Sequence, residues 1–286
     1  MKIIESIEEM REYSQQLKRE GKIIGSIDSE SYLHEGHMSL VDIARNNADV
    51  VVFDICHTLE YFNYPTEEYE EYIKIYEQEF LEKDIELCKK QGVDVFFMPS
   101  MSDIHLDSSP LNISIPVIDQ LVIDRPDSPP VYMEYIVGFT IFFTILMPDV
   151  ILLGQKDIHQ TFAVKSIIKQ LDLPIKVITA PIIRETEGLA LSSRNRFLTS
   201  SQRQNATSIY QTLHEISRWS TYPSVTEIKE HITNRINQAN GNIAHIDICC
   251  VETLKELNSI NKKFIIIVNA KFGDVDYLID NIIIEP

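Results

Sequence analysis

The chain has 286 residues, of which 44% are hydrophobic and 24% charged, a composition that suits a globular protein with one large or two unequal domains. Its formal net charge of -17 opposes binding to nucleic acid or to an anionic membrane surface through long-range electrostatics. The sequence has no run of 18 or more apolar residues, and its first residues lead into a charged amphipathic segment instead of a signal peptide. We therefore expect a cytoplasmic protein whose partners are small molecules.

The four cysteines, Cys56, Cys88, Cys249 and Cys250, have neither the spacing of zinc ligands nor that of a disulfide framework. Cys249 and Cys250 are adjacent, and in a strand they would point to opposite faces. We expect reduced, mostly buried thiols.

Apolar, β-branched segments alternate with helical patterns through the first two thirds of the chain. This rhythm predicts an α/β fold, with a mostly parallel sheet covered by helices on both faces. Such sheets bind ligands at the carboxyl ends of their strands, so the loops that follow the strands are candidate binding segments. Strands are expected over residues 23–27, 50–56, 93–98, 150–153 and 175–179, and helices over residues 39–47, 66–91, 133–146 and 158–171.

The rhythm changes after Pro181, where two helical patterns are followed by apolar strand patterns. This order predicts a smaller α+β domain in the carboxy-terminal third. We place the two domains at residues 1–182 and 183–286. The expected helices cover residues 200–218 and 225–238, and the expected strands lie near residues 243–251, 264–270 and 275–280.

The tetrapeptide His34-Glu35-Gly36-His37 lies between the first expected strand and a helical pattern. A helix N-terminus offers unpaired backbone N–H groups and a positive dipole end, and two imidazoles there can donate hydrogen bonds to phosphoryl oxygens. Gly36 lets the backbone approach a ligand closely. A zinc site fits less well, because a helical zinc-binding pair has histidines at i and i+4, whereas this pair is at i and i+3. Two ordinary loop histidines are the remaining interpretation.

Two further polar segments are candidate binding residues. One follows an expected strand, and the other lies near the start of the second domain. Lys156 and Asp157 come directly after the strand at 150–153, so we expect them to face the same crevice as the histidines. The cluster Ser192-Ser193-Arg194 follows the stretch at residues 187–191. Taken singly, these residues also suit a surface ion pair and a simple turn. Together with the histidine motif they indicate adenylate chemistry.

With these motifs in this order, the chain resembles the pantothenate synthetase (pantoate-β-alanine ligase) family of the nucleotidyltransferase superfamily, whose signature is His-x-Gly-His. The resemblance implies a Rossmann-like amino-terminal domain, a smaller carboxy-terminal domain that closes over ATP, and a homodimer. The matching segments lie at residues 33–41, 92–96, 148–149, 154–157, 171–174, 187–196 and 278–281.

The resemblance also implies an activity with two steps. A carboxylate attacks the α-phosphorus of ATP and releases pyrophosphate, and an amine then attacks the acyl-adenylate to give an amide and AMP. Mg²⁺ would bridge the phosphates and use few protein ligands, so no metal ligand is assigned to the chain.

The family's functional positions can be transferred residue by residue. The histidines, His34 and His37, would bind the phosphates, while Lys156 and the Ser192-Ser193-Arg194 cluster would hold the β and γ phosphates and the departing pyrophosphate. Each of these groups is a donor directed at growing negative charge. The remaining ATP and acid positions are Gly36, Gly154, Asp157 and Gln160, with Gly154 beside the adenosine, Asp157 near the ribose and Gln160 on the acid substrate.

The departures from the family pattern fall where the substrates would be bound. The family has Pro-Thr-Met-Gly-Ala where this chain has residues 28–32, so Glu30 replaces a methionine. In the next motif His57 replaces an asparagine and Glu60 replaces the glutamine that binds pantoate. The Arg-Pro-Gly-His-Phe-Arg-Gly segment is missing near residues 128–134. Ionised glutamate can only accept hydrogen bonds, so these changes disfavour a simple anionic hydroxy acid.

We therefore expect an ATP-dependent, AMP-forming carboxylate-amine ligase with a changed, more cationic substrate that carries an amino or guanidino group. One alternative is an authentic pantothenate synthetase, which joins pantoate and β-alanine. A second is a nucleotidyltransferase that transfers a nucleotide to a phosphate acceptor, and a third is a non-catalytic paralogue that binds ATP. The sequence leaves the identity of both substrates open.

Overall fold

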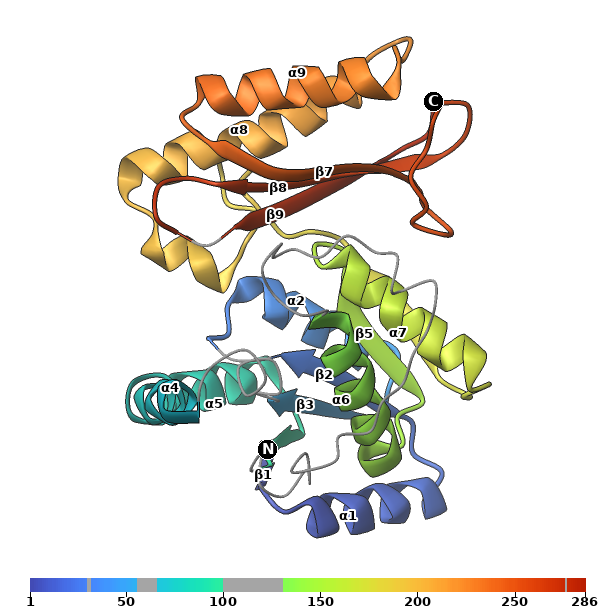
Figure 1. Ribbon diagram of the computed structural model, residues 1–286. Helices are drawn as coiled ribbons and strands as arrows, with labels where there is room; N and C mark the ends of the chain where they lie inside the picture. Colours follow the sequence, from blue (N-terminus) through green and yellow to red (C-terminus); the bar gives the residue numbers. More distant parts are fainter. Residues whose placement is uncertain (30–31, 56–65, 100–130, 276) are drawn as a thin grey trace. The chain divides into compact units, whose positions relative to one another are not determined.

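The computed structural model describes residues 1–29, 32–55, 66–99, 131–275 and 277–286 (Figure 1). The chain divides into two compact units. Within the described residues, unit 1 comprises residues 1–154 and 160–180, and unit 2 comprises Gln155–His159 and Pro181–Pro286. The short segment Gln155–His159 is thus part of unit 2, although the chain on both sides of it belongs to unit 1.

Unit 1 is built around a six-stranded parallel sheet, counted over the described residues. The strand order is β1-β4-β3-β2-β5-β6. The strands are β1 (Lys2–Ile4), β2 (Ile24–Ser29), β3 (Val50–Ile55), β4 (Val95–Phe97), β5 (Val150–Gly154) and β6 (Lys176–Ala180).

Successive side chains along each strand point to opposite faces of this sheet. Both faces are apolar, and helices cover both of them. On one face, the side chains of Ile24 and Val52 pack with α1 and α6. On the other, Ile27 and Phe53 pack with α2 and α5. The parallel pairing and the burial of both faces confirm the α/β prediction. The helices of the unit are α1 (Ile7–Arg19), α2 (Glu35–Arg45), α4 (Thr66–Glu79), α5 (Leu81–Gln91), α6 (Val131–Leu146) and α7 (Ile158–Gln170).

Two sequence predictions for unit 1 are corrected by the structure. The single helix expected over residues 66–91 is two helices, with Phe80 between them. The ring of Phe80 packs edge-on against Tyr32, and the hydroxyl of Tyr76 donates to Asp84, so tertiary contacts surround the break. The helix expected from residue 39 begins four residues earlier, at Glu35.

Unit 2 contains an antiparallel sheet of order β7-β8-β9 with two helices on one of its faces (Figure 1). Its described elements are the short 3-10 helix η2 (Ser193–Phe197), α8 (Ser200–Ile216), α9 (Val225–Gln238), β7 (Asn242–Cys250), β8 (Phe264–Lys271) and β9 (Leu278–Ile284). Leu213 of α8 and Ile232 of α9 pack on Ile248 and Ile266 of the sheet. This arrangement confirms the α+β prediction, and the last strand ends later than the expected residue 280.

The described cysteines are free and buried, as expected. Burial raises the pKa of the Cys88 and Cys249 thiols to about 12, which keeps both as neutral thiols at physiological pH. The fourth cysteine, Cys56, lies outside the described residues.

Candidate active site

The strand order of unit 1 reverses direction at β2. From β2 the chain builds outward through β3 and β4, and it then returns to pair β5 with the other side of β2. Parallel sheets bind ligands at such a switch point, outside the carboxyl ends of the two central strands. Here those ends are Ser29 and Gly154, and the histidine motif follows the first of them.

The two histidines cap the helix that follows β2. His34 is the N-cap of α2, and its Nδ1 accepts a hydrogen bond of 3.1 Å from the backbone N–H of Gly36. The Nδ1 of His37 accepts a 3.3 Å hydrogen bond from the backbone N–H of His34. The two rings stack with their centroids 4.0 Å apart. The tetrapeptide therefore forms a reciprocal helix cap, which fixes the positions of both imidazole rings.

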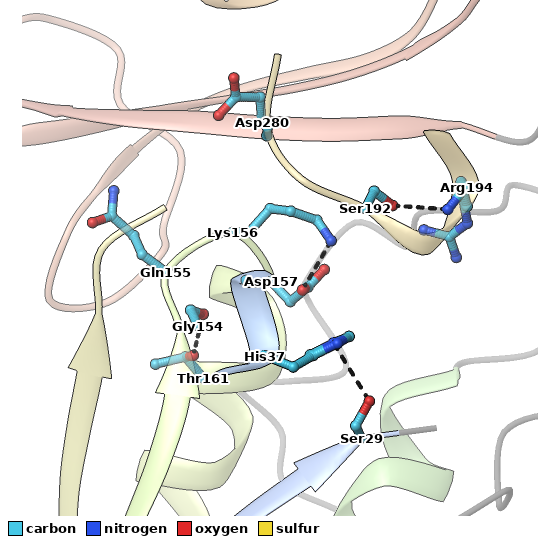
Figure 2. Close-up of polar contacts among 12 residues, drawn as sticks. Ser29, His37, Gly154, Gln155, Lys156, Asp157, Thr161, Ser192, Arg194 and Asp280 are labelled. Carbon is cyan, nitrogen blue, oxygen red and sulfur yellow. Dashed lines mark hydrogen bonds and ion pairs between the residues drawn. The ribbon is translucent and has the colours of Figure 1, made fainter. Parts of the chain in front are cut away.

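The cap also determines which ring nitrogen carries the proton. Because Nδ1 accepts a hydrogen bond in each ring, each neutral ring carries its hydrogen on Nε2. The Nε2 of His37 lies 3.4 Å from Oγ of Ser29 at the end of β2 (Figure 2). In the neutral form both histidines thus present Nε2–H donors beside a helix N-terminus, which is a suitable arrangement for a phosphate.

A buried carboxylate holds the segment that leads into this cap. Asp84 of α5 accepts a 3.0 Å hydrogen bond from the backbone N–H of Leu33 and another of 3.0 Å from the hydroxyl of Tyr76. Tyr32 has a positive φ of 53° and packs edge-on against Tyr76. These contacts fix the approach to His34, and the sequence motif alone did not reveal them.

Beside the histidine cap, β2 and β3 carry an acidic pair, of which Asp54 is buried and Asp28 partly buried. Asp28 and Asp54 are register neighbours, and their side chains are hydrogen-bonded to each other. Ser26 donates a 2.9 Å hydrogen bond to Asp54. Burial raises the pKa of Asp54 to about 7. The family pattern has a proline at the position of Asp28, so this end of the sheet differs chemically from that pattern.

The proposed pyrophosphate-binding cations belong to unit 2. The side chain of Lys156 is 18% exposed, and its Nζ lies 3.4 Å from Oδ2 of Asp157 (Figure 2). Asp157 is 44% exposed. The two side chains therefore form an ion pair, which was one of the interpretations of this segment from its sequence. The partial burial of Lys156 distinguishes it from an ordinary surface lysine.

The serine-arginine cluster opens η2. Ser192 is the N-cap of this helix, and its Oγ accepts a 3.3 Å hydrogen bond from the backbone N–H of Arg194 (Figure 2). Asn195 is buried, and its amide donates to Glu185 and to the carbonyl of Ala190. Arg203 of α8 pairs with Glu185 and donates to the carbonyl of Asn195. This network ties the cluster to the hairpin before it and to the helix after it.

That hairpin depends on a glycine. Gly188 has a φ of 97°, and its N–H donates to the carbonyl of Glu185 across the turn. A Cβ at Gly188 would lie 2.1 Å from the ring of Tyr210. Arg184 packs over the same ring and forms a two-point ion pair with the buried Asp280. The turn is thus anchored to both α8 and β9.

The predicted site residues fall into three groups. His34, Gly36, His37, Gly154 and Gln160 lie in unit 1, and Gln160 is partly buried at the start of α7. Lys156, Asp157, Ser192, Ser193 and Arg194 lie in unit 2. Glu30, His57 and Glu60 lie outside the described residues. Among the described residues, no group of three histidine, cysteine or carboxylate side chains is arranged to hold a metal ion.

Comparison with known proteins identifies the relatives of the chain. The family model described as pantoate-beta-alanine ligase matches residues 2–283. The chain belongs to the pantoate-beta-alanine ligase family. It is 31% identical to the pantothenate synthetase of Acetivibrio thermocellus over 290 residues, covering all of both chains, and 33% identical to that of Thermotoga petrophila, covering 99% of this chain and all of the relative.

Solved structures of this family have the same fold. Pantothenate synthetase from Thermus thermophilus matches with a TM-score of 0.85 at 26% identity, covering all of both chains. Pantoate-beta-alanine ligase from Francisella tularensis, complexed with beta-gamma ATP and beta-alanine, matches with a TM-score of 0.75 at 28% identity, covering 99% of this chain and 97% of that chain. Membership of the pantoate-beta-alanine ligase family makes the chain an ATP-dependent, AMP-forming carbon-nitrogen ligase. Within its described residues, no helix is long and apolar enough to cross a bilayer.

Proposed function

We propose that the chain condenses a carboxylic acid with an amine through an acyl-adenylate, and that at least one of these substrates is more cationic than pantoate or β-alanine. The observation that carries the reaction type is the match to the ligase family over residues 2–283, with both phosphate motifs retained. The proposed substrate class rests on the departures from the family pattern.

In the first step, an oxygen of the substrate carboxylate bonds to the α-phosphorus of ATP. The bond between that phosphorus and the oxygen bridging to the β-phosphorus breaks, and pyrophosphate leaves. His34 and His37 donate through Nε2–H to phosphate oxygens, and the N-terminus of α2 adds its dipole. Lys156, Ser192, Ser193 and Arg194 hold the β and γ phosphates, because the charge on the departing pyrophosphate is largest there.

In the second step, the amine nitrogen attacks the acyl carbon, AMP leaves with the bonding electrons, and the nitrogen loses a proton. Gly36 allows the phosphate to approach α2, Gly154 lies beside the adenosine, Asp157 binds near the ribose, and Gln160 binds the acid. Mg²⁺ would bind to the phosphates, with few ligands from the protein, and would neutralise part of their charge.

Three sequence departures support the changed substrate. Glu30 and Glu60 add carboxylates, and His57 replaces an asparagine, at positions where the family binds its acid. The described part of the chain adds one observation, the acidic pair of the partly buried Asp28 on β2 and the buried Asp54 on β3. Added carboxylates disfavour an anionic acid, because buried negative charges repel one another and are costly without a cationic partner.

An authentic pantothenate synthetase remains the second candidate. It is favoured by relatives of that name at 31% and 33% identity over the whole chain. A homodimer and a cytoplasmic location are further expectations from the resemblance.

The test is substrate-dependent exchange of labelled pyrophosphate into ATP, with pantoate and a panel of amino, guanidino and hydroxy acids. We expect exchange with a cationic acid. Exchange with pantoate and with no cationic acid, together with amide formation from β-alanine and from no more cationic amine, would establish the authentic synthetase. ATP binding without exchange for any acid, and without amide formation for any acid and amine pair, would favour a non-catalytic paralogue, and a stable nucleotide-linked product would favour a nucleotidyltransferase.

A further inference from the structure

The segment Gln155–His159, here called the lysine loop, is bound to the sheet of unit 2 at its first two residues. The Nδ2 of Asn281 donates 2.9 Å hydrogen bonds to the backbone carbonyls of Gln155 and Lys156. The Oδ1 of Asn281 accepts a 3.0 Å hydrogen bond from the side chain of Gln155. Asn281 is 1% exposed, so this amide makes its three bonds in a water-poor environment where they are strong.

The other end of the lysine loop contacts a second strand of the same sheet. The Nε2 of His159 lies 3.7 Å from Oδ2 of Asp247 on β7, and both side chains are 9% exposed. The other carboxylate oxygen, Oδ1, lies 2.6 Å from Nε2 of His245. One buried carboxylate therefore contacts two imidazoles, and only one of them belongs to the lysine loop.

The two anchors lie on one line across the sheet. Asp247 pairs with Ile267 of β8, and Ile267 pairs with Asn281 of β9. Residues that are register neighbours point to the same face, and this face is opposite to the one that packs on α8 and α9. Adjacent strands are about 4.8 Å apart, so β7 and β9 are about 10 Å apart. Residues 156 and 157 form a turn and α7 begins at Ile158, so this short segment joins the two anchors.

Unit 1 holds the chain at the points where the lysine loop leaves and returns. The hydroxyl of Thr161 donates a 3.1 Å hydrogen bond to the carbonyl of Gly154, and Thr161 is 1% exposed (Figure 2). Gly154 and Thr161 are thus hydrogen-bonded to each other within unit 1, while the lysine loop between them contacts the sheet of unit 2 at both of its ends.

We propose that Asn281 and Asp247 are positioning residues for the ligase reaction, which act through the lysine loop to place the ammonium of Lys156. This inference rests on the proposed role of Lys156 at the ATP phosphates. Asn281 fixes the backbone of Lys156 directly, and Asp247 fixes the loop three residues later. Lys156 therefore belongs to the same unit as Ser192 and Arg194, although the chain on both sides of the lysine loop belongs to the other unit.

The first test is a double-mutant cycle on the pyrophosphate exchange rate, with Asn281→Asp and Lys156→Ala. The aspartate removes the donor and places a negative charge against two carbonyl oxygens. We expect Asn281→Asp to lower kcat by about 10- to 100-fold, because misplacing a catalytic group by an ångström has an effect of this size. Equilibrium binding of ATP should weaken by a smaller factor than kcat falls, since the charge on the phosphates that Lys156 holds grows during the reaction.

In the Lys156→Ala background the same substitution should lower kcat by less than about 2-fold, because the group that it misplaces is gone. Additive effects would overturn the inference and leave the role of Lys156 intact. A normal rate for Lys156→Ala would instead overturn the role of Lys156, and the inference with it.

The second test separates the two imidazoles on Asp247. His159→Gln removes the contact between the loop and the sheet, whereas His245→Gln removes the shorter contact to the same carboxylate and leaves the loop untouched. We expect kcat to fall by about 10-fold or more for His159→Gln and by less than about 2-fold for His245→Gln. Far-UV circular dichroism and the melting temperature confirm that each variant is folded. Equal effects of the two substitutions would show a general effect on the sheet and overturn the assignment of Asp247.

Discussion

Arg194 and Arg196 stand two residues apart in the same motif, but their surroundings differ. Arg194 is partly buried and donates its backbone N–H to Ser192, whereas Arg196 is exposed and packs over the exposed ring of Phe197. We expect Arg194→Ala to lower the rate of adenylate formation by about 10²- to 10³-fold, which is typical when one donor to transition-state charge is removed. The measurement is pyrophosphate release in a single turnover.

Arg196→Ala is the matched control, because it removes an identical charge from the same short helix. Its rate should stay within about 3-fold of the native rate, and both variants should melt within a few degrees of the native protein, since surface substitutions change stability little. Equal losses in the two variants would indicate that the motif acts through its net charge and would contradict the role of Arg194.

Asp54 provides a prediction on pH and stability at the residue scale. Burial raises its pKa from 3.8 to about 7, so the folded protein binds this proton more tightly than the unfolded chain. The stabilising contribution is complete below pH 4 and is lost as the pH rises through 7. Asp54→Asn cannot ionise, so it should raise the melting temperature relative to the native protein at pH 8 and much less at pH 5. A stability difference that is the same at both pH values would contradict this assignment.

At the scale of elements, the hairpin before the serine-arginine cluster depends on Gly188. An alanine at this position would be destabilising for two reasons. Its φ of 97° is unfavourable for a residue with a Cβ, and the Cβ would lie too close to the ring of Tyr210. Left-handed backbone costs about 1–2 kcal/mol and overpacking about 1–3 kcal/mol, so Gly188→Ala should destabilise the protein by roughly 2–5 kcal/mol. Gly21→Ala is the control, because Gly21 has a φ of 71° and nothing within 4 Å of the added Cβ.

Urea unfolding followed by circular dichroism measures both variants. Gly21→Ala should show the backbone cost alone, about 1–2 kcal/mol. If the two variants lose the same free energy of unfolding, the contact with Tyr210 does not constrain the turn.

The sequence predicted those elements whose residues follow a clear local pattern. Buried parallel strands such as Val50–Ile55 are continuous apolar runs, and their alternation with helical patterns indicated the α/β fold. The short strand Lys2–Ile4 and the helix Ile7–Arg19 were not predicted, because three residues are too few for a pattern and the helix is mostly charged or polar. The break at Phe80 was missed since no glycine or proline marks it.

The candidate site was predictable where a motif is local and not where it is tertiary. His34 and His37 were identified because four consecutive residues between a strand and a helical pattern form a local signature, whereas the hydrogen bonds by which they cap α2 were not predicted. Asn281 was noted as part of a matching segment, but its contact with Lys156 spans 125 residues. His159 and Asp247 are likewise far apart in the sequence, and neither is unusual in its own segment. Contacts of this kind depend on the fold and not on any local pattern.

At the scale of the whole molecule, the proposed ATP residues are divided between two bodies with separate cores. The core of unit 2 includes Leu213, Ile232 and Ile248, and Trp219 packs against it. Trp219 is the single tryptophan of the chain, so its fluorescence follows the unfolding of unit 2, while far-UV circular dichroism follows both units. The two signals together can therefore show which unit a ligand stabilises.

ATP should raise the melting temperature of the Trp219 signal if Lys156 and Arg194 bind its phosphates. A ligand at 100 times its Kd stabilises the state that binds it by about 2.7 kcal/mol, which is an upward shift of several degrees for a domain of about 100 residues. In the Lys156→Ala, Arg194→Ala double variant this shift should largely disappear, since histidine contacts in unit 1 do not stabilise the core around Trp219 directly. If ATP raises the melting temperature of the Trp219 signal equally in the double variant, unit 2 is stabilised through other contacts. Lys156 and Arg194 would then have no part in binding ATP in the ground state.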